Sequence, residues 1–295
     1  MDKALISIIV PTYNRTGYLA QTLNSIMGQT YRPIEIIVVD DGSTGDENNV
    51  LCNRYPEVRY IKIENSGGPA KPRNVGFEAS TGKYVAWVDD DDLWLKDKLQ
   101  QQMDVLNSEP DFDLIHGPCV VIDEHSNETG QLIGRPGSAE IKHGDVRGRI
   151  MGNWTLMMPT PLLRRSLVQS VGLFNEQIPA ALEDVEFWVR CSFFSKFYYL
   201  DRPLVQYRKH AENISASKKK YVQLPLYLNE VRKQMFRLKK TDRALDKQLS
   251  QNLVRMQLKS IKEDWWRSLG NAFRINPWWP LYISNIKILI KRMIK

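Results

Sequence analysis

Residues 84–92 read YVAWVDDDD, a short apolar run that passes directly into four consecutive aspartates. An apolar run of this length, with valine and aromatic residues, is typical of a strand that is buried on both faces of a sheet. The same pattern occurs at Leu5–Val10, which leads into PTYNR, and at Ile34–Val39, which leads into DDGS. The sequence therefore predicts several buried strands whose carboxyl ends carry polar side chains.

Helical patterns separate these predicted strands. Apolar residues recur at helical spacing between Tyr18 and Met27, a third buried strand is expected over Val58–Ile63, and a helix is expected through Arg73–Ala79. This βαβα order predicts an α/β fold with a mostly parallel central sheet and helices on both faces. Ligands of such sheets bind beyond the carboxyl ends of the strands, so we expect the functional site among the polar clusters there.

The four aspartates are the most informative feature of the chain. Carboxylates this close repel one another unless a cation or hydrogen-bond donors offset their charge. An oxygen-only set suits Mg²⁺ or Mn²⁺, and no group of His or Cys lies nearby to suggest zinc. Because side chains alternate along a strand, we expect Asp89 and Asp91 on one side and Asp90 and Asp92 on the other. The alternative is that Asp92 caps a helix expected over Leu93–Leu106, but capping requires only one acid.

Composition and cysteine spacing exclude several classes of protein. With 42% hydrophobic and 25% charged residues, the chain is neither disordered nor a disulfide-stapled miniprotein. Its three cysteines lack CxxC spacing, which argues against zinc ribbons and favours a reducing compartment. We see no signal peptide and no apolar stretch of the roughly 18 residues that a membrane-spanning helix needs. We therefore expect a cytoplasmic protein.

Charge is distributed unevenly along the 295 residues. Residues 218–295 contain 19 basic and 5 acidic residues, whereas residues 1–217 contain 22 basic and 29 acidic residues. Regions of opposite sign indicate different roles, with the basic one facing phosphate groups. Nucleic acid is disfavoured as a partner because the acidic region repels it and no nucleic-acid-binding motif is present. We predict a catalytic domain over residues 1–217 and a basic, mainly helical extension over residues 218–295.

The end of the extension predicts contact with a membrane. Its apolar residues fall on one helical face: Ile283, Ile286, Leu289, Ile290, Met293 and Ile294. Four basic residues and no acid accompany them, and five aromatic residues lie upstream: Trp265, Trp266, Trp278, Trp279 and Tyr282. This is the composition of an amphipathic helix that lies on anionic lipid at the inner face of a cell membrane. The alternative is that the apolar face packs within the protein or against a second copy in a homo-oligomer.

The motifs together resemble a known family. SIIVPTYNR, EIIVVDDGST, the stretch from Gly67 to Gly76 and YVAWVDDDDLW resemble the inverting family 2 glycosyltransferases of GT-A fold. ALEDVEFWVR at residues 181–190 and YRKHAENIS at residues 207–215 follow in the same order. The resemblance covers about residues 4–215. The chain departs from the family pattern in Lys71-Pro72, where small residues are commoner, and in having no basic residue beyond Arg15 in the first motif.

This resemblance implies a set of residues that bind a nucleotide-sugar. At the end of the first strand the implied contacts are Pro11, Tyr13, Asn14 and Arg15, with Tyr13 packing on the base. Asp41 matches the acid that accepts the uracil N3–H, Arg73 matches an arginine near the diphosphate, and Asp89 or Asp90 lies near the ribose. Each position has a structural alternative: Tyr13 as a core aromatic, Asp40-Asp41 as an ordinary turn and Arg73 as a surface residue.

The resemblance also implies the metal ligands and the base. Asp91 is the firmest ligand for Mn²⁺ or Mg²⁺, Asp89 accompanies it, and His210 is a possible further ligand or a structural residue. Asp184, with Glu183 beside it, matches the general base that deprotonates the acceptor hydroxyl. Alternatively, both acids only favour the start of a helix through its dipole.

These residues lead to one expected function and two alternatives. We expect a metal-dependent inverting glycosyltransferase that moves a sugar from a UDP-sugar, or secondly a dTDP-sugar, to a glycan or lipid-linked acceptor in surface polysaccharide synthesis. A non-catalytic carbohydrate- or membrane-binding relative is the alternative from another class. A sugar nucleotidyltransferase is disfavoured because residues 11–17 lack a glycine-rich, basic loop for a triphosphate.

Overall fold

The computed structural model describes residues 3–134, 139–214 and 218–294. By their contacts these residues form two compact units, each assembled from separated segments. The first unit comprises residues up to 144 together with 156–176 and 194–213, and the second comprises residues 145–155, 177–193 and those from 214 onward. The functional division after residue 217 remains a prediction.

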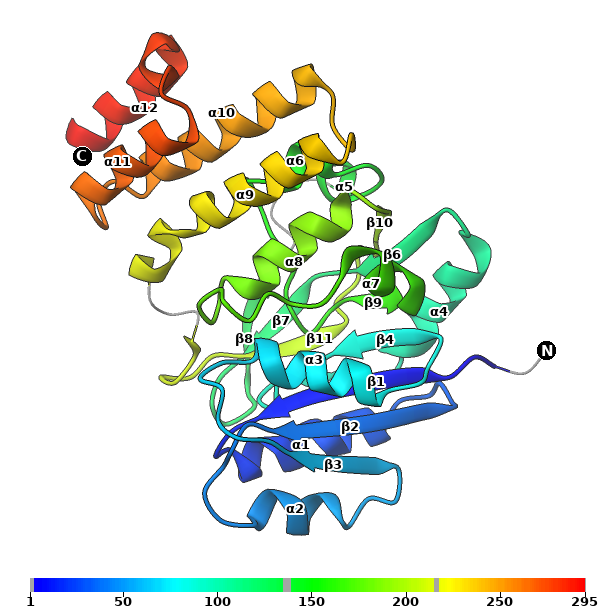
Figure 1. Cartoon of the computed structure of the whole chain (residues 1–295). Helices are drawn as coiled ribbons and strands as arrows, with labels where there is room; N and C mark the ends of the chain where they lie inside the picture. The colour runs from blue at the N-terminus through cyan, green and yellow to red at the C-terminus, as the bar shows by residue number, and fades with distance from the viewer. Residues whose placement is uncertain (1–2, 135–138, 215–217, 295) are drawn as a thin grey trace. The chain divides into compact units, whose positions relative to one another are not determined.

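The first unit is built on two sheets (Figure 1). The larger has the order β10-β6-β9-β4-β1-β2-β3 and the smaller has the order β5-β11-β7-β8. The strands of the larger sheet are β1 (Ile6–Thr12), β2 (Ile34–Asp40), β3 (Val58–Lys62), β4 (Tyr84–Trp87), β6 (Phe112–His116), β9 (Leu162–Arg164) and β10 (Lys196–Tyr199). Those of the smaller sheet are β5 (Leu93–Trp94), β7 (Cys119–Ile122), β8 (Glu128–Ile133) and β11 (Val205–Arg208).

The four predicted strands are confirmed and pair in parallel around β1. The expected burial of β3 is wrong, because it lies at the edge of the sheet and its residues are half-buried or exposed. Every residue of β1 is buried, as the continuous apolar run indicated. The helices of this unit are α1 (Thr16–Met27), α2 (Glu47–Cys52), α3 (Ala70–Ala79), α4 (Lys98–Ser108), α5 (Ala139–Lys142) and α7 (Arg165–Val171). Right-handed crossovers put α1 and α2 on one face, whereas α3, which returns the chain past β1 to β4, lies on the other.

The segment after the four aspartates differs from the prediction. Leu93 and Trp94 form β5, which pairs antiparallel with β11, and the following helix α4 begins only at Lys98, after Asp97. Asp92 therefore does not cap a helix; its Oδ1 accepts the backbone N–H of Arg208. The expected alternation of the four side chains is also wrong, because β4 ends at Trp87 and the aspartates lie in a turn.

The second unit is helical. Its elements are α6 (Arg147–Ile150), α8 (Glu183–Ser192), η2 (Lys218–Val222), α9 (Leu224–Arg237), α10 (Arg243–Lys259), α11 (Trp265–Ile275), η3 (Trp279–Leu281) and α12 (Ile283–Ile294). Helix α10 packs against α9, α11 and α12, and its buried residues include Leu249 and Leu253. In the described part of the chain, no helix combines the length and the hydropathy needed to cross a membrane.

Candidate nucleotide-sugar site

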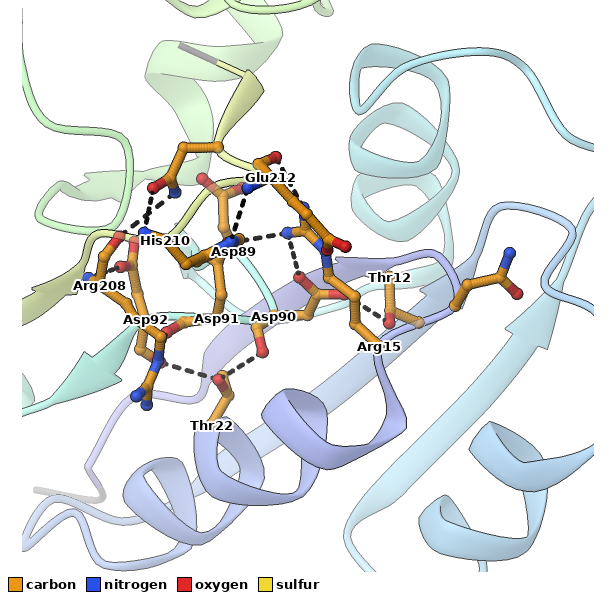
Figure 2. Close-up of polar contacts among 12 residues, drawn as sticks. Thr12, Arg15, Thr22, Asp89, Asp90, Asp91, Asp92, Arg208, His210 and Glu212 are labelled. Carbon is orange, nitrogen blue, oxygen red and sulfur yellow. Dashed lines mark hydrogen bonds and ion pairs between the residues drawn. The ribbon is translucent and has the colours of Figure 1, made fainter. Parts of the chain in front are cut away.

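The acidic turn Asp89–Asp92 follows β4 and lies beside the carboxyl end of β1 (Figure 2). Thr12, the last residue of β1, donates from Oγ1 to Asp90 Oδ2 at 2.7 Å. On α1, the hydroxyl of Thr22 donates to the backbone oxygens of Asp90 and Asp92 at 2.9 and 2.8 Å. The first strand and the first helix thus fix the turn from two sides.

Arg15 and His210 meet the carboxylate of Asp91. Arg15 Nη1 lies 2.8 Å from Asp91 Oδ2 and 3.4 Å from Asp90 Oδ1. His210 Nε2 lies 2.9 Å from the same Asp91 Oδ2. The structure thereby brings together four residues that were predicted separately from three motifs. Burial, and secondly the charge of Asp91, raise the pKa of Asp90 to about 7.

The hydrogen bonds of His210 define its tautomer. The backbone N–H of Glu212 donates to His210 Nδ1 at 3.2 Å, so Nδ1 is an acceptor. Nε2 then carries the proton and donates it to Asp91 Oδ2. To bind a metal ion through Nε2, the ring must move its proton to Nδ1 and release the bond from Glu212.

The residues present fit a divalent cation that also binds a ligand's phosphate oxygens. Within the described ranges, no group of three or more His, Cys, Asp or Glu residues is placed to hold a metal ion. Mg²⁺ commonly uses one or two carboxylates together with substrate phosphates, and Asp91 supplies one such carboxylate.

Arg73 and Asp89 form a separate ion pair beside the turn. Arg73 lies on α3, is almost fully buried and donates from Nη2 to Asp89 Oδ1 at 2.7 Å. Its guanidinium also lies over the ring of Phe174, with 5.5 Å to the centroid. The burial excludes the alternative that Arg73 is a surface residue. That Asp89 contacts ribose or metal remains a prediction.

The two acids after β2 have different environments. Asp40 is fully buried and accepts hydrogen bonds from Ser43 N, Asn48 Nδ2 and Tyr60 Oη, so its role is structural. Asp41 accepts from the amide and the hydroxyl of Ser66, both at Oδ1. Gly42 follows with φ of +80°, and a side chain there would lie 2.7 Å from the backbone nitrogen of Asn65. Only glycine allows this close approach, which brings Asp41 against the loop after β3.

The residues after β1 line an open groove. Pro11 is buried in the strand, whereas the ring of Tyr13 is 48% exposed and is therefore not a core aromatic. Asn14 adopts a positive φ of 53° and is held by Ser43 and Thr44. The groove has a volume of about 340 Å³ and is lined by Asn14, Arg15, Thr16, Gly17, Tyr18, Gln21 and Glu212. This volume is within the range of small-molecule sites.

Arg208 holds the acidic turn in place through hydrogen bonds, a role that the sequence did not reveal. Its side chain is fully buried over the ring of Tyr18. Nε donates to the backbone oxygen of Asp91 at 2.8 Å, and Nη2 donates to Gln21 Oε1 at 2.8 Å. Nη1 donates to Ser126 and to two backbone carbonyls of the β7–β8 connection. The only signal in the sequence was a strand arginine two residues before His210.

The predicted base lies in the second unit. Glu183 and Asp184 begin α8, and Glu183 is buried, with Oε2 accepting the backbone N–H of Leu182. Asp184 Oδ1 accepts the N–H of Val185. Tyr221 of η2 is near both acids: burial first, and then the charges of Asp184 and Glu183, raise its pKa to about 12. Ser215, which belongs to the last motif, lies outside the described residues.

Comparison with known proteins matches the glycosyl transferase family 2 model to residues 7–171. An uncharacterized glycosyltransferase of Rickettsia conorii is 33% identical over 218 residues, which are 70% of this chain but only 34% of the relative's length. Glycosyltransferase GlyG of Streptococcus pneumoniae is 33% identical over 181 residues, 58% of each protein. This chain therefore matches only part of each relative.

Two solved structures share the fold. Residues 1–349 of Staphylococcus aureus TarS in complex with UDP-GlcNAc match with a TM-score of 0.66 at 21% identity, covering 97% of this chain and 78% of that one. The mannosyltransferase PcManGT of Pyrobaculum calidifontis, in complex with GDP-Man and Mn²⁺, matches with a TM-score of 0.60 at 16% identity, covering 100% and 87%. The expected GT-A fold is confirmed, and the chain belongs to glycosyl transferase family 2.

Proposed function

We propose that this glycosyltransferase moves a sugar from a UDP-sugar to a hydroxyl of a glycan or lipid-linked glycan, with inversion and with the aid of Mn²⁺ or Mg²⁺. The observation that carries the proposal is the buried carboxylate of Asp91, held at the strand ends by His210 and by Arg15, which itself lines the groove. Surface polysaccharide synthesis at the cytoplasmic face of the cell membrane is the setting we infer for it.

We assign the residues at the strand ends to two parts of the donor, its base and its diphosphate. Asp41 uses Oδ1 for Ser66, so we assign Oδ2 to the N3–H of uracil, with thymine as the second choice. Tyr13, with its exposed ring, stacks on the base. Arg15 and Arg73 offer planar guanidinium groups to phosphate oxygens.

The reaction requires a base and a stabilised leaving group. Asp184 accepts the proton of the acceptor hydroxyl as its oxygen bonds to the anomeric carbon, while the bond from that carbon to the diphosphate breaks. Attack opposite the leaving group inverts the anomeric configuration. A bound divalent cation neutralises the charge of the departing diphosphate. Asp91, and His210 after its change of tautomer, are the residues that would hold this cation.

Thermal unfolding with nucleotides tests donor and metal binding together. UDP should raise the melting temperature more with Mn²⁺ than with EDTA, and Asp91→Asn should remove that difference. Asp104→Asn is the matched control, because Asp104 is an exposed aspartate that accepts from Gln100. UDP and dTDP should stabilise the protein more than GDP does, since guanine presents a different edge to Asp41.

Equal UDP shifts with Mn²⁺ and EDTA would contradict the metal assignment. Metal-dependent UDP binding without turnover on any lipid-linked acceptor would favour the non-catalytic alternative.

A further inference from the structure

The end of the helical unit exposes large apolar side chains. Trp266 is 82% exposed, Leu281 76%, Ile283 74% and Trp278 68%, which are the four highest values among the large apolar residues described as exposed. Phe273 and Ile290 are about half exposed. We call these six residues the apolar surface. All six lie between Trp266 and Ile290, and large exposed apolar side chains concentrated in one segment mark an interaction site rather than scattered surface composition.

The folding of this segment holds these side chains outward. Helix α11 turns Ser268, Asn271 and Ala272 inward, whereas Trp266 and Phe273, seven residues apart, share the opposite face. In the turn that follows, Trp279 is buried and its ring lies 5.5 Å from that of Phe273. Its neighbour Trp278 is left outside. The surface is therefore preformed, which lowers the entropic cost of binding.

Positive charge is interleaved with the apolar surface. Arg267 follows Trp266, Arg274 follows Phe273 and Lys291 follows Ile290, and all three basic residues are exposed. From Trp265 to the end of the chain there are six basic residues and no acidic residue. On α12, Ile283, Lys287 and Ile290 are all exposed and their spacing places them on one face.

We propose that the apolar surface and its interleaved cations bind an anionic phospholipid bilayer, with Trp278, Leu281 and Ile283 entering the headgroup region. Tryptophan and aliphatic side chains partition into this region, and cations beside them attract acidic headgroups. The proposal does not rest on the proposed sugar transfer. It places the contact on α11, η3 and the exposed face of α12, whereas the sequence indicated the apolar stripe of the last helix together with the aromatic residues upstream of it.

The arrangement of charge favours lipid over other occupants. A face-to-face pair of copies would bring two such positive surfaces together, which opposes a self-complementary dimer. A protein partner is disfavoured because protein interfaces concentrate apolar residues in a core depleted of charge. Here a cation follows directly after three of the six apolar residues.

Of the predicted stripe, Ile286 and Leu289 are half-buried, and the side chains of Met293 and Ile294 lie outside the described residues.

Co-sedimentation of the full chain with vesicles tests this proposal. The protein should bind vesicles of phosphatidylcholine mixed with phosphatidylglycerol, and bind pure phosphatidylcholine vesicles more weakly. Trp278→Ser with Leu281→Ser should lower binding to both by roughly tenfold or more, because apolar burial is lost. Lys287→Gln with Lys291→Gln should lower binding only to the anionic vesicles, by roughly fivefold for each charge.

The control is Val50→Ser with Leu132→Ser, which removes two exposed apolar side chains from the first unit and should leave vesicle binding unchanged. All variants should keep the melting temperature of the unmodified chain, because the replaced side chains are exposed. No binding to anionic vesicles, or an equal loss in the control, would overturn the proposal. A concentration-dependent dimer that only Trp278→Ser with Leu281→Ser dissolves, without vesicle binding, would assign the surface to self-association instead.

Discussion

The acidic turn Asp89–Asp92 buries charge, whereas the apolar surface around Trp278 exposes large hydrophobic side chains. Asp90 and Asp91 are almost fully buried, and Trp278 and Leu281 are mostly exposed. Ordinary folding favours the reverse in both places, because desolvating a carboxylate and hydrating an indole both cost free energy. Each region therefore holds an arrangement that folding alone does not explain.

The two regions meet this cost in different ways. The turn is held by hydrogen bonds from Thr12, Thr22, Arg15 and Arg208, so its carboxylates stay fixed before any ligand binds. The apolar surface projects from a segment whose inward side chains, among them Ala272, Ile275 and Trp279, are buried. A ligand with specific chemistry needs a rigid polar framework, whereas a fluid lipid surface needs only exposed apolar and basic groups.

The largest effect is expected from the Asp184 variant. It tests whether the second unit, which carries the apolar surface, also contributes a catalytic residue. Asp184→Asn keeps the side-chain volume but cannot accept the acceptor's proton at neutral pH. It should lower turnover by about 10²–10⁴-fold while UDP affinity stays within a few fold. Steady-state kinetics with a lipid-linked acceptor, together with a UDP titration, would measure both quantities.

Two further variants make the Asp184 test specific. Glu230→Gln changes an exposed glutamate of α9 and should leave turnover unchanged. Full activity of Asp184→Asn combined with an inactive Glu183→Gln would transfer the role of base to Glu183.

A smaller effect is expected from Arg208, which tests how rigid the polar framework is. Arg208→Lys keeps the charge, but an ammonium cannot reach the acceptors that Nε, Nη1 and Nη2 now satisfy. Each acceptor left buried and unsatisfied costs about 1–3 kcal/mol, so we expect unfolding free energy to fall by about 2 kcal/mol. Urea unfolding would measure the loss.

The affinity for UDP with Mn²⁺ separates positioning from stability in this variant. Because Arg208 holds the backbone oxygen of Asp91, the folded variant should bind UDP more weakly with Mn²⁺ but equally in EDTA. Arg202→Lys, at an exposed arginine of the same segment, should change neither quantity. An unchanged affinity in Arg208→Lys would assign this residue to stability alone.

The sequence predicted the part of the fold that depends on local pattern. Apolar patterns located β1 to β4 to within two residues. For β1, β2 and β4 the reason is burial on both faces, which leaves little choice of side chain, whereas β3 is only partly buried. The second sheet was missed because β8, at Glu128–Ile133, has no buried position and β5 has only two residues. Leu93 and Trp94 form a strand through pairing with Gln206 and Val205, a contact that no local pattern reveals.

The candidate site divides in the same way. Asp91, Arg15 and His210 were chosen from motifs, and the structure brings them to one point. The role of Arg208 could not be inferred, because its partners lie more than 80 residues away along the chain. The exposure of Trp278 could not be inferred either, since the sequence places two tryptophans side by side and does not say which one is buried.

The smallest effect is expected from Lys98, which tests whether every buried charge in the first unit marks a functional site. Lys98 is fully buried, donates to Gln102 Oε1 at 2.9 Å and lies 3.9 Å from the ring centroid of Trp94. Burial lowers its pKa well below the usual value. Between that lowered pKa and the ordinary lysine value of about 10.4, the unfolded chain holds a proton that the folded protein lacks. Stability therefore falls as pH falls through this range. Lys98→Met should stabilise the protein by about 1 kcal/mol at pH 7, since folding then no longer requires this side chain to give up a proton. The gain should shrink as the pH approaches 10, because the unfolded lysine then also loses its proton.

Calorimetric melting at pH 7 and pH 10 measures this difference. The control is Lys96→Met, at an exposed lysine two residues away, which should change stability by less than about 0.5 kcal/mol. A loss of stability in Lys98→Met at both pH values would mean that the lysine is charged in the folded state and that its contact with Trp94 outweighs the cost of burial.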